Sequence, residues 1–227
     1  MMSDTPKKLA AERAIEFVRD GQVVGLGTGS TAKFAIEGIA ARVREGLKVT
    51  GVPTSLATQR MAEGLGIPLT TLNEVPAIDI TIDGADEVDG SLNMIKGGGG
   101  ALTREKLVAL ASLKRVIIVD ERKLVSTLGE SWPVPVEVLP FAWTRSARKL
   151  SELGCAAELR GSVGEPLETD NGNYILDCRF GPIANAPDME KRIKLIPGVI
   201  ECGLFIGIAD LLVIGFDGRV EVRERQP

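Results

Sequence analysis

The sequence predicts an α/β fold in which a domain built on a parallel sheet carries a smaller α+β insert. In the first 130 residues, short apolar runs alternate with segments whose apolar residues recur at helical spacing, as in βαβ units. Between residues 131 and 206 the order becomes β-α-β-β-α-β, which is typical of a ferredoxin-like unit. We therefore predict one domain over 1–130, completed by 207–227, and a second domain over 131–206.

In the first domain, helices and strands follow from apolar spacing and from glycine and proline positions. Thr5 and Pro6 predict a helix start, with Thr5 as the N-cap and Pro6 at the first helical position. Apolar residues at i, i+3, i+4 and i+7 predict a second helix from Thr31. Further helices are expected over 55–64 and around 107–111. Short apolar or alternating runs predict strands at 23–26, 78–82 and 116–119.

In the second domain, a cluster of prolines and an Asn171-Gly172 turn divide the chain. The predicted strands are 134–139, 156–160, 174–180 and 199–205, and the predicted helices lie around 147–153 and 189–196. Two last strands, 211–214 and 219–222, flank an Asp217-Gly218 turn and are expected to return to the first sheet.

The composition excludes several functional classes. The chain of 227 residues and 24.2 kDa contains 27 Lys and Arg against 31 Asp and Glu, and it has no histidine. Without histidine there is no Ser-His-Asp triad, no histidine base and no histidine-ligated metal. Acid–base chemistry must therefore use carboxylate, Lys, Cys or Tyr. The net charge of −4 argues against a nucleic-acid partner.

Targeting and membrane signals are not found. No apolar segment of a signal peptide follows Met1. The most apolar stretch, 203–216, is interrupted by Asp210 and is too short to span a bilayer. The chain has three cysteines that lie far apart, which predicts buried thiols in a reducing compartment. We expect a soluble cytoplasmic protein with no membrane partner.

A first glycine-rich loop, 25–31, lies between a predicted strand and a predicted helix. Free N–H groups and the positive end of the helix dipole suit a phosphate there. The dinucleotide motif G-x-G-x-x-G fails because Ser30 occupies the third glycine position, and the Walker A spacing fails too. A nicotinamide cofactor is therefore not expected. The alternative is a tight turn capped by Ser30 or Thr31.

An acidic loop, 83–89, follows the strand 78–82. Asp83 and Asp86 would lie beyond the carboxyl end of that strand, where ligands bind in open α/β sheets. Two such carboxylates can separate their pKa values or accept hydrogen bonds from sugar hydroxyls. A calcium loop is disfavoured by the acidic spacing. A magnesium site and a solvated acidic turn stay open as alternatives.

A second glycine loop, 97–100, follows Lys96. Four successive glycines are entropically costly to order, which suggests that the backbone passes close to a ligand, although a flexible linker is the alternative. Lys96 can supply a fixed positive charge for an oxyanion. Glu105 lies near the start of the next helix. One interpretation is that its negative charge simply interacts favourably with the helix dipole. The other, which rests on the two glycine loops and the aspartates nearby in the sequence, is that Glu105 is the candidate base.

These motifs resemble a known family. The segments 25–32, 83–87 and 96–106, in this order, are similar to those of type A ribose-5-phosphate isomerase. Further similar stretches extend the resemblance over nearly the whole chain: 135–138, 169–173 and 196–199. The segment 203–210 follows the family only loosely. The resemblance implies a Rossmann-like domain with a ferredoxin-like insert, in agreement with the fold predicted above.

The resemblance also implies roles for the matching residues. It makes Glu105 the general base that moves a proton between C2 and C1 of the sugar. It assigns sugar binding, ring opening and handling of the O1 and O2 protons to Asp83, Asp86 and Lys96. It implies that a further set contacts the phosphate and the sugar: Thr28, Gly29, Ser30, Thr31, Gly84, Ala85, Gly97, Gly98, Gly99, Lys123 and Lys7. Lys8 is adjacent to Lys7, and the choice between the two stays open.

The predicted reaction interconverts D-ribose 5-phosphate and D-ribulose 5-phosphate through an enediolate, in the non-oxidative pentose phosphate pathway. A free glutamate titrates near ~4.3, so it is ionised at neutral pH but is a weak base. Stabilisation of the enediolate by Lys96 and by backbone N–H groups would make that base sufficient. The resemblance implies no metal and no organic cofactor. It also implies a homodimer or homotetramer.

Two other functions remain to be weighed. The first is a sugar-phosphate sensor, because bacterial repressors use related α/β domains to bind ligands. Such repressors carry a DNA-binding helix-turn-helix, whereas this acidic chain begins its α/β pattern almost immediately. The second is a metal-dependent sugar hydrolase built on the loop 83–89, which a chelator would inactivate.

Overall fold

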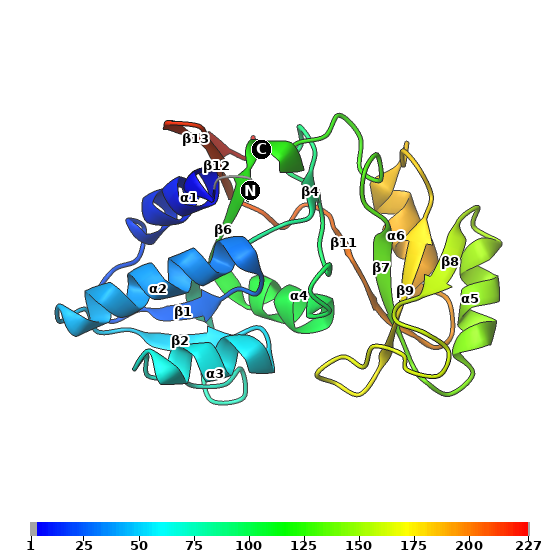
Figure 1. Cartoon of the computed structure of the whole chain (residues 1–227), viewed down its shortest axis with the longest axis horizontal. Coiled ribbons are helices and arrows are strands. Elements are labelled where there is room, and N and C mark those ends of the chain that lie inside the picture. Colours follow the sequence, from blue (N-terminus) through cyan, green and yellow to red (C-terminus); the bar gives the residue numbers. More distant parts are fainter. Residues whose placement is uncertain (1–3, 227) are drawn as a thin grey trace. The chain divides into compact units, whose positions relative to one another are not determined.

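The computed structural model describes residues 4–226, which divide into two compact units. The first unit comprises the described residues of Met1–Ala85, Arg104–Lys123 and Ile208–Pro227, and the second comprises Asp86–Thr103 and Leu124–Gly207. Figure 1 shows the elements of both units in sequence colours. Each unit is described by itself.

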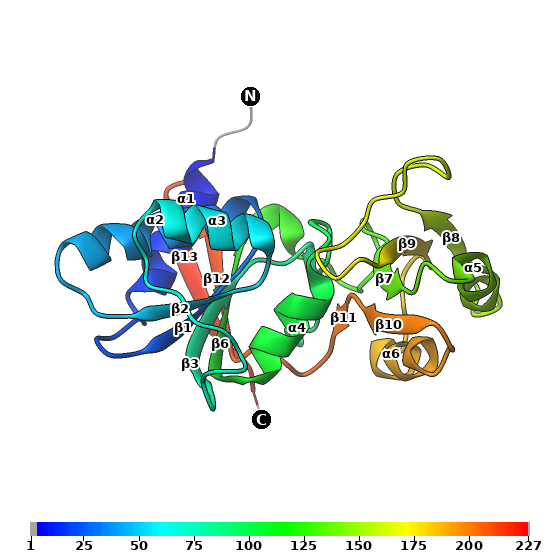
Figure 2. The same cartoon turned by 90° about the horizontal axis from the view of Figure 1, so that it is seen from below.

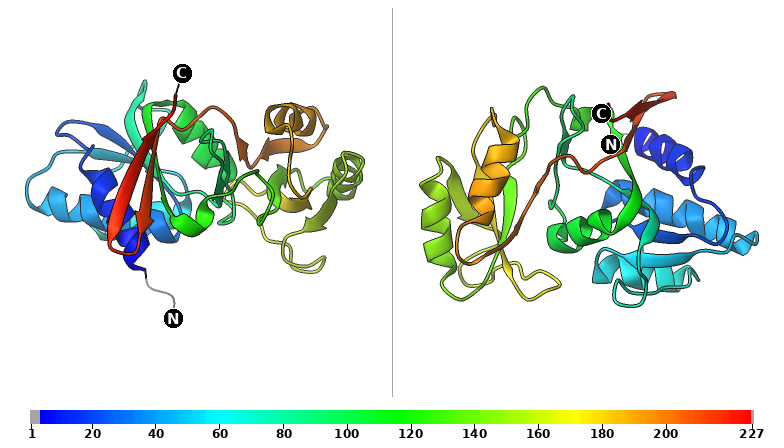
Figure 3. Two further views of the ribbon diagram at one scale, coloured as in Figure 1. Left: turned by 90° about the horizontal axis from the view of Figure 1, so that it is seen from above. Right: turned by 180° about the vertical axis from the view of Figure 1, so that it is seen from behind.

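The first unit is built on a six-stranded sheet. Its strand order is β13-β12-β6-β3-β1-β2, with bounds β1 Val23–Leu26, β2 Thr50–Pro53, β3 Ile78–Asp83, β6 Ser112–Asp120, β12 Leu211–Phe216 and β13 Arg219–Glu224. The first five strands in chain order run parallel, and β13 pairs antiparallel with β12 in a terminal hairpin, drawn in red in Figure 3. Numbered along the chain, the parallel strands have the doubly wound order 2-1-3-4-5, whose switch point lies between β1 and β3. The predicted α/β fold and the return of the last two strands are confirmed.

Helices cover both faces of this sheet (Figure 2). The helices are α1 Thr5–Ile15, α2 Ser30–Arg44, α3 Leu56–Gly64 and α4 Leu102–Leu110, and a short 3-10 turn, η1, spans Glu121–Lys123. Helices α1, α2 and α3 bury small and branched apolar side chains against one face, in a core that includes Leu26, Ile36 and Ile82. On the other face, Val108 of α4 packs with Val52 and Ile78. The N-cap of α1 is Asp4, so the prediction of Thr5 as the cap is wrong by one residue.

Two of the apolar residues that predicted α4 do not face the core, since Leu107 and Leu110 are 53% and 63% exposed. The buried residues of the helix are Leu102, Glu105, Lys106, Val108 and Ala109, and Leu102, Glu105 and Val108 among them recur at helical spacing. Close packing on Gly25 fixes this rotation, because a Cβ there would lie 2.8 Å from Cγ1 of Val108.

The second unit is built on a four-stranded antiparallel sheet of order β10-β7-β9-β8. Its elements are β7 Val134–Val138, α5 Trp143–Ser151, β8 Ala156–Leu159, β9 Tyr174–Arg179, α6 Ala186–Lys194 and β10 Val199–Cys202. This is the predicted β-α-β-β-α-β order, which is confirmed. Leu150 of α5 and Ile193 of α6 lie in one core with the sheet residues. The three cysteines are buried and free, as predicted.

A small sheet that the sequence did not predict completes the second unit. It has the order β11-β5-β4, with β4 Glu87–Val88, β5 Met94–Ile95 and β11 Leu204–Phe205. The single strand predicted over 199–205 is therefore wrong, because the chain changes sheets at Gly203. The N–H of Gly203 donates to the carbonyl of Pro135 at 2.7 Å, and its carbonyl accepts from the N–H of Lys96 at 2.9 Å. A Cβ at Gly203 would lie 2.3 Å from the Lys96 carbonyl oxygen, so only glycine fits.

Within residues 4–226, no helix has the length and apolarity needed to cross a membrane.

Candidate active site

The first glycine loop lies at the switch point of the sheet, between the carboxyl ends of β1 and β3. The N–H of Gly27 donates to the carbonyl of Ile82 at 3.0 Å. Oδ1 of Asp83 accepts from the N–H of Thr28 at 3.1 Å and from that of Gly84 at 2.7 Å. A Cβ at Gly27 would lie 2.2 Å from that oxygen. This glycine is therefore required by the packing of Asp83, which is 2% exposed.

The hydroxyl of Thr28 belongs to a network of hydroxyl groups. Its Oγ1 lies 2.7 Å from Oγ1 of Thr54, 2.9 Å from Oγ of Ser55 and 3.1 Å from Oγ1 of Thr58. The Thr54 and Thr58 hydroxyls donate to the carbonyls of Leu26 and Gly27, each at 2.9 Å. The network thus attaches the loop to the start of α3. Sequence reasoning missed these three partners, although polar residues directly after β2 were a usable signal.

The start of α2 provides uncapped backbone N–H groups. The helix begins at Ser30, and its N-cap is Gly29, with φ of 110°. Ser30 and Thr31 are the first helical residues, so the alternative in which one of them caps the turn is wrong. A helix start capped by a residue without a side chain leaves its N–H groups for a ligand or water.

Two lysines named by the resemblance also belong to the first unit. The Lys7 side chain is 18% exposed and lies 3.2 Å from Asp4, whereas that of Lys8 is 64% exposed. Lys123 ends η1, directly after the buried Asp120. Burial alone raises the pKa of Asp120, but hydrogen bonds from Arg122 at 2.8 and 2.9 Å and the charge of Lys123 outweigh burial and hold that pKa below its usual value.

The carboxylates of the acidic loop accept hydrogen bonds from backbone N–H groups in different parts of the chain. Oδ2 of Asp86 accepts from the N–H of Gly98 at 2.7 Å. The buried Glu87 accepts from three N–H groups at 2.6 Å each, those of Gly129, Ser131 and Trp132. Asp89 accepts from the N–H groups of Ser91 and Asn93 in the β4–β5 turn. The loop is therefore not a simple solvated turn, and across residues 4–226 no group of three or more His, Cys, Asp or Glu could hold a metal.

The second glycine loop is held at several points. Gly97 has φ of 105°, and the N–H of Gly100 donates to its carbonyl at 3.0 Å, which closes a turn. A Cβ at Gly98 would lie 2.6 Å from Oδ1 of Asp86. Lys96 is 3% exposed, and its ammonium nitrogen lies 5.6 Å from the centroid of the Phe205 ring. The second glycine loop is therefore ordered by defined contacts, and the buried cation Lys96 directly precedes it.

Glu105 lies in the first turn of α4 and is 5% exposed. It is the polar member of the buried stripe formed with Leu102 and Val108. A favourable position on the helix dipole does not require burial, and burying a carboxylate is costly unless it is partnered or used. The burial therefore singles Glu105 out among the acidic residues near helix starts.

A second buried carboxylate holds the start of the same helix. Glu137 of β7 is fully buried and accepts from the hydroxyl of Thr103, two residues before Glu105. It also accepts from the Thr169 hydroxyl and the Asn173 amide, each at 2.8 Å. The resemblance included these stretches without giving Glu137 a role.

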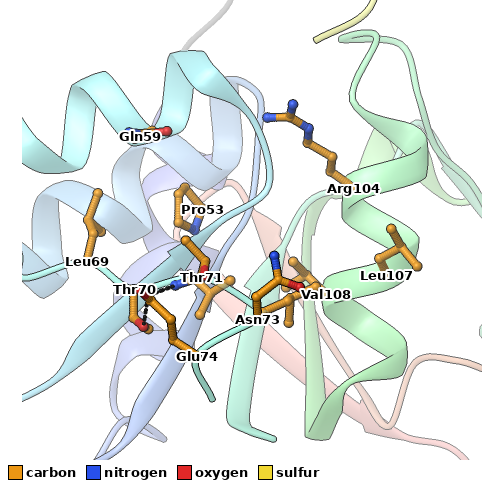
Figure 4. A pocket seen from close by; sticks show the side chains of 12 residues that line it. Pro53, Gln59, Leu69, Thr70, Thr71, Asn73, Glu74, Arg104, Leu107 and Val108 are labelled. Carbon is orange, nitrogen blue, oxygen red and sulfur yellow. Dashed lines mark hydrogen bonds between the residues drawn. The ribbon is translucent and has the colours of Figure 1, made fainter. Parts of the chain in front are cut away.

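A cavity within the first unit is lined by none of the predicted site residues. It measures about 560 Å³ and is lined by the end of β2, the connection from α3 to β3, and α4. Figure 4 shows Arg104 of α4 and Gln59 of α3 on opposite sides of this cavity. Below them, Glu74 accepts hydrogen bonds from the Thr70 hydroxyl and the Thr71 N–H.

The structure therefore brings together part of the predicted set. Within the first unit it joins Thr28, Asp83 and Gly84, and within the second it joins Asp86 and Gly98. Lys96 and Glu105 belong to different units, and both are buried.

Comparison with known proteins gives a consistent result. A family model described as ribose 5-phosphate isomerase A (phosphoriboisomerase A) matches residues 50–218. The ribose-5-phosphate isomerase A of Gloeobacter violaceus is 56% identical over 220 residues, which cover 96% of each chain. A solved D-ribose-5-phosphate isomerase in complex with phospho-erythronic acid superposes with a TM-score of 0.95 at 43% identity, covering 99% of this chain and 100% of that one. The ribose 5-phosphate isomerase of Plasmodium falciparum gives a TM-score of 0.95 at 42% identity, with the same coverage.

Proposed function

The chain belongs to the ribose 5-phosphate isomerase A family, and from this premise we propose how its residues interconvert ribose 5-phosphate and ribulose 5-phosphate. It is an aldose–ketose isomerase, so each turnover moves one proton between C2 and C1 and exchanges an aldehyde for a ketone.

Glu105 is the general base, and its burial is the observation that carries the assignment. A carboxylate at 5% exposure on the buried stripe of α4 is shielded from water, which strengthens its interaction with a nearby proton. Asp83 is comparably buried, and the two backbone N–H groups that donate to its Oδ1 hold it in one orientation, which suits it to bind the sugar.

The first step is ring opening. The bond between C1 and the ring oxygen breaks, the C1 hydroxyl loses its proton, and the ring oxygen gains one, which yields the C1 aldehyde. Asp83, Asp86 and Lys96 are proposed to bind the sugar hydroxyls and to exchange these protons. Each aspartate is fixed by the N–H of a glycine loop, so the two carboxylates are oriented before substrate binds.

Proton transfer follows. Glu105 takes the C2 proton, the C2–H electron pair forms the C1=C2 bond, and the aldehyde π pair moves to O1. The O2 proton then moves to O1, the C2 carbonyl forms, and Glu105 returns its proton to C1. The charge that develops on the enediolate oxygens is stabilised by the buried Lys96 ammonium and by the N–H groups of Gly97 and Gly99 in the second glycine loop, since the Gly98 N–H donates to Asp86.

The phosphate is proposed to bind at the start of α2. Gly29, Ser30 and Thr31 supply N–H groups there, and Lys7 and Lys123 supply positive charge on an otherwise acidic chain. Lys7 is preferred to Lys8 because its side chain is less exposed. Thr28, Gly84 and Ala85 complete the proposed sugar contacts, and the Thr28 hydroxyl acts mainly by holding the loop.

The decisive experiment replaces Glu105 by Gln. We expect kcat to fall by about 1,000-fold while calorimetry still detects ribose 5-phosphate binding, because only the base is removed. Glu12→Gln, at an exposed position on α1, is the control and should retain full activity. Near-normal turnover by Glu105→Gln would refute the assignment.

A second measurement tests the enediolate. In D2O, part of the ribulose 5-phosphate should carry solvent deuterium at C1, because a proton held by Glu105 can exchange with solvent before it returns. Complete retention of the substrate hydrogen would remove this support for the enediolate. Activity is expected to be unchanged after treatment with a chelator, and its loss would favour the metal-dependent hydrolase.

We also propose a wider setting. The protein acts in the cytoplasm as a homodimer or homotetramer, which light scattering during size-exclusion chromatography would determine. Residues 1–130 with 207–227 act as the catalytic domain, and 131–206 act as the ferredoxin-like domain.

A further inference from the structure

We infer that Arg160 is a positioning residue, which sets the orientation of the peptide groups in the second glycine loop. Arg160 directly follows β8. It belongs to the second unit, and so does every group with which it is shown to interact. The inference deepens the proposed function, since it rests on that loop being a source of N–H donors for the enediolate.

The guanidinium of Arg160 binds the loop directly. Its Nη1 donates to the carbonyl oxygen of Gly97 at 2.8 Å and to that of Gly98 at 3.2 Å. The other edge of the guanidinium is occupied by Asp177 of β9, which accepts from Nε at 2.9 Å and from Nη2 at 2.5 Å. Both side chains are mostly buried, at 16% and 20% exposure.

The backbone of Arg160 is fixed as well. Its N–H donates to the carbonyl of Ile175 at 2.9 Å, and its carbonyl accepts from the N–H of Leu167 at 2.9 Å. The side chain therefore extends from a fixed point, and Asp177 restricts its remaining freedom. A group ordered in this way loses little further entropy when it binds the loop carbonyls.

The consequence lies in the geometry of a planar trans peptide, whose C=O and N–H point in opposite directions. The carbonyl of Gly97 and the N–H of Gly98 belong to one peptide group. Arg160 holds its oxygen, and Asp86 accepts from its N–H at 2.7 Å, so this group is fixed at both ends.

The next peptide group contains the carbonyl of Gly98 and the N–H of Gly99. Because Arg160 also binds the Gly98 oxygen, the Gly99 N–H is directed away from the guanidinium. Glycine peptides rotate easily, and without Arg160 this N–H would sample several directions. An oxyanion donor has to be oriented before the reaction to be effective.

Only arginine suits this position. The two loop carbonyls and the Asp177 carboxylate require several donors in one plane, which the guanidinium supplies. A lysine ammonium is a single point charge and cannot reproduce this arrangement.

The test compares Arg160→Ala and Arg160→Lys with Arg179→Ala. Arg179 is an exposed arginine on β9 that lines the same cavity of about 270 Å³ as Arg160 and Gly98, so it is a matched control. We expect kcat of Arg160→Ala to fall by about 10- to 100-fold with a smaller change in KM, because misplaced donors act mainly on the transition state. Arg160→Lys should recover only part of the loss, and Arg179→Ala should match the wild type.

Chemical rescue separates positioning from a general role in folding. Guanidinium ion at low millimolar concentration should restore part of the activity of Arg160→Ala, and it should restore none to Glu105→Gln. Arg160→Ala activity within twofold of wild type, or a loss equal to the fraction of unfolded protein without rescue, would overturn the inference.

A measurement without substrate keeps this inference distinct from the proposed function. The amide hydrogens of Gly98 and Gly99 should exchange faster in Arg160→Ala than in the wild type or Arg179→Ala. Unchanged exchange would overturn the positioning role. If exchange accelerates while Glu105→Gln remains active, the assigned base is wrong and the anchoring of the loop stands.

Discussion

The two glycine loops both pack closely against an aspartate, but different kinds of side chain hold them in place. In each, a backbone N–H donates to an aspartate: Thr28 to Asp83 at 3.1 Å and Gly98 to Asp86 at 2.7 Å. In each, a glycine leaves space for that aspartate, because a Cβ at Gly27 or Gly98 would lie 2.2 or 2.6 Å from a carboxylate oxygen.

The loops differ in what supports them. The first joins β1 directly to α2, and neutral hydroxyls of Thr54, Ser55 and Thr58 hold it. The second follows the two-residue strand β5, and an arginine 63 residues further along the chain holds it with a charge. The first loop is thus held by neutral hydroxyls 26 to 30 residues further along the chain, whereas the run of glycines after β5 is held by a charged and more distant side chain.

The largest expected effect on stability comes from adding a Cβ at the glycine that packs against the aspartate in each loop. Gly27→Ala should lower the free energy of unfolding by about 3 kcal/mol, because the new Cβ also meets the Asp83 backbone, with Cα at 2.6 Å. Gly98→Ala should cost only about 1 kcal/mol, because it meets a side chain that can move. Urea denaturation measures both, and Gly64→Ala in α3, where a Cβ meets nothing within 4 Å, is the control. Equal losses for the two variants would remove the distinction between the loops.

The next effect concerns the charged support at the end of the second loop. Glu137→Gln replaces one acceptor oxygen by an amide donor, which then faces either the Thr169 hydroxyl and the Asn173 amide or the Thr103 hydroxyl. We expect a loss of about 2 kcal/mol and a lower kcat, because in either orientation the buried hydrogen-bond network that holds the start of α4 is no longer fully satisfied. Thermal unfolding and a coupled assay measure these changes. The exposed Glu158→Gln on β8 should change neither quantity, and a neutral Glu137→Gln would show that the anchor is not needed.

A smaller effect is expected at the neutral support of the first loop. Thr58→Val keeps the side-chain shape but removes the hydroxyl that donates to the Gly27 carbonyl at 2.9 Å. The expected loss of stability is about 1 kcal/mol, typical of one neutral hydrogen bond. Thr144→Val, at an exposed position in α5, serves as the reference in the same urea titration. A loss as large as that of Glu137→Gln would contradict the ranking of neutral below charged supports.

The smallest effect depends on pH. The pKa of Asp120 is held below its usual value, so its pairing with Arg122 stabilises the fold above a pH of about 4 and is lost as pH falls through the folded pKa. Because Arg122 is 47% exposed, the contribution is about 1 kcal/mol or less. Asp120→Asn should therefore be less stable than wild type at pH 7, and the difference should shrink at pH 3. A difference that stays constant with pH would show that the ion pair contributes nothing.

The sequence predicted what depends on local periodicity and missed what depends on distant contacts. Apolar spacing located nearly every long helix and strand, including the return of 211–214 and 219–222 to the first sheet. It did not predict the change of sheet at Gly203. That change depends on close packing against the carbonyl of Lys96, which lies more than 100 residues earlier in the sequence.

The candidate site shows the same division. Asp83, Asp86 and Lys96 could be predicted as site residues because each follows a strand or precedes a glycine run. Arg160 and Glu137 were not assigned roles, because their contacts are with neighbours that only the folded chain brings near. For α4, spacing indicated a helix but not its buried stripe, because that stripe includes a glutamate that a hydrophobic pattern does not count.

The position of β12 has a consequence for synthesis on the ribosome. β12 lies between β6 and β13 and pairs with β6 in parallel, yet it is translated about 90 residues after β6. Until residues 211–216 emerge, β6 has an unpaired edge with the apolar side chains of Val116, Ile118 and their neighbours. The chain also passes between its two units four times, at residues 85–86, 103–104, 123–124 and 207–208. Neither unit is a continuous fragment, so the first sheet remains incomplete on the ribosome until β12 has been made.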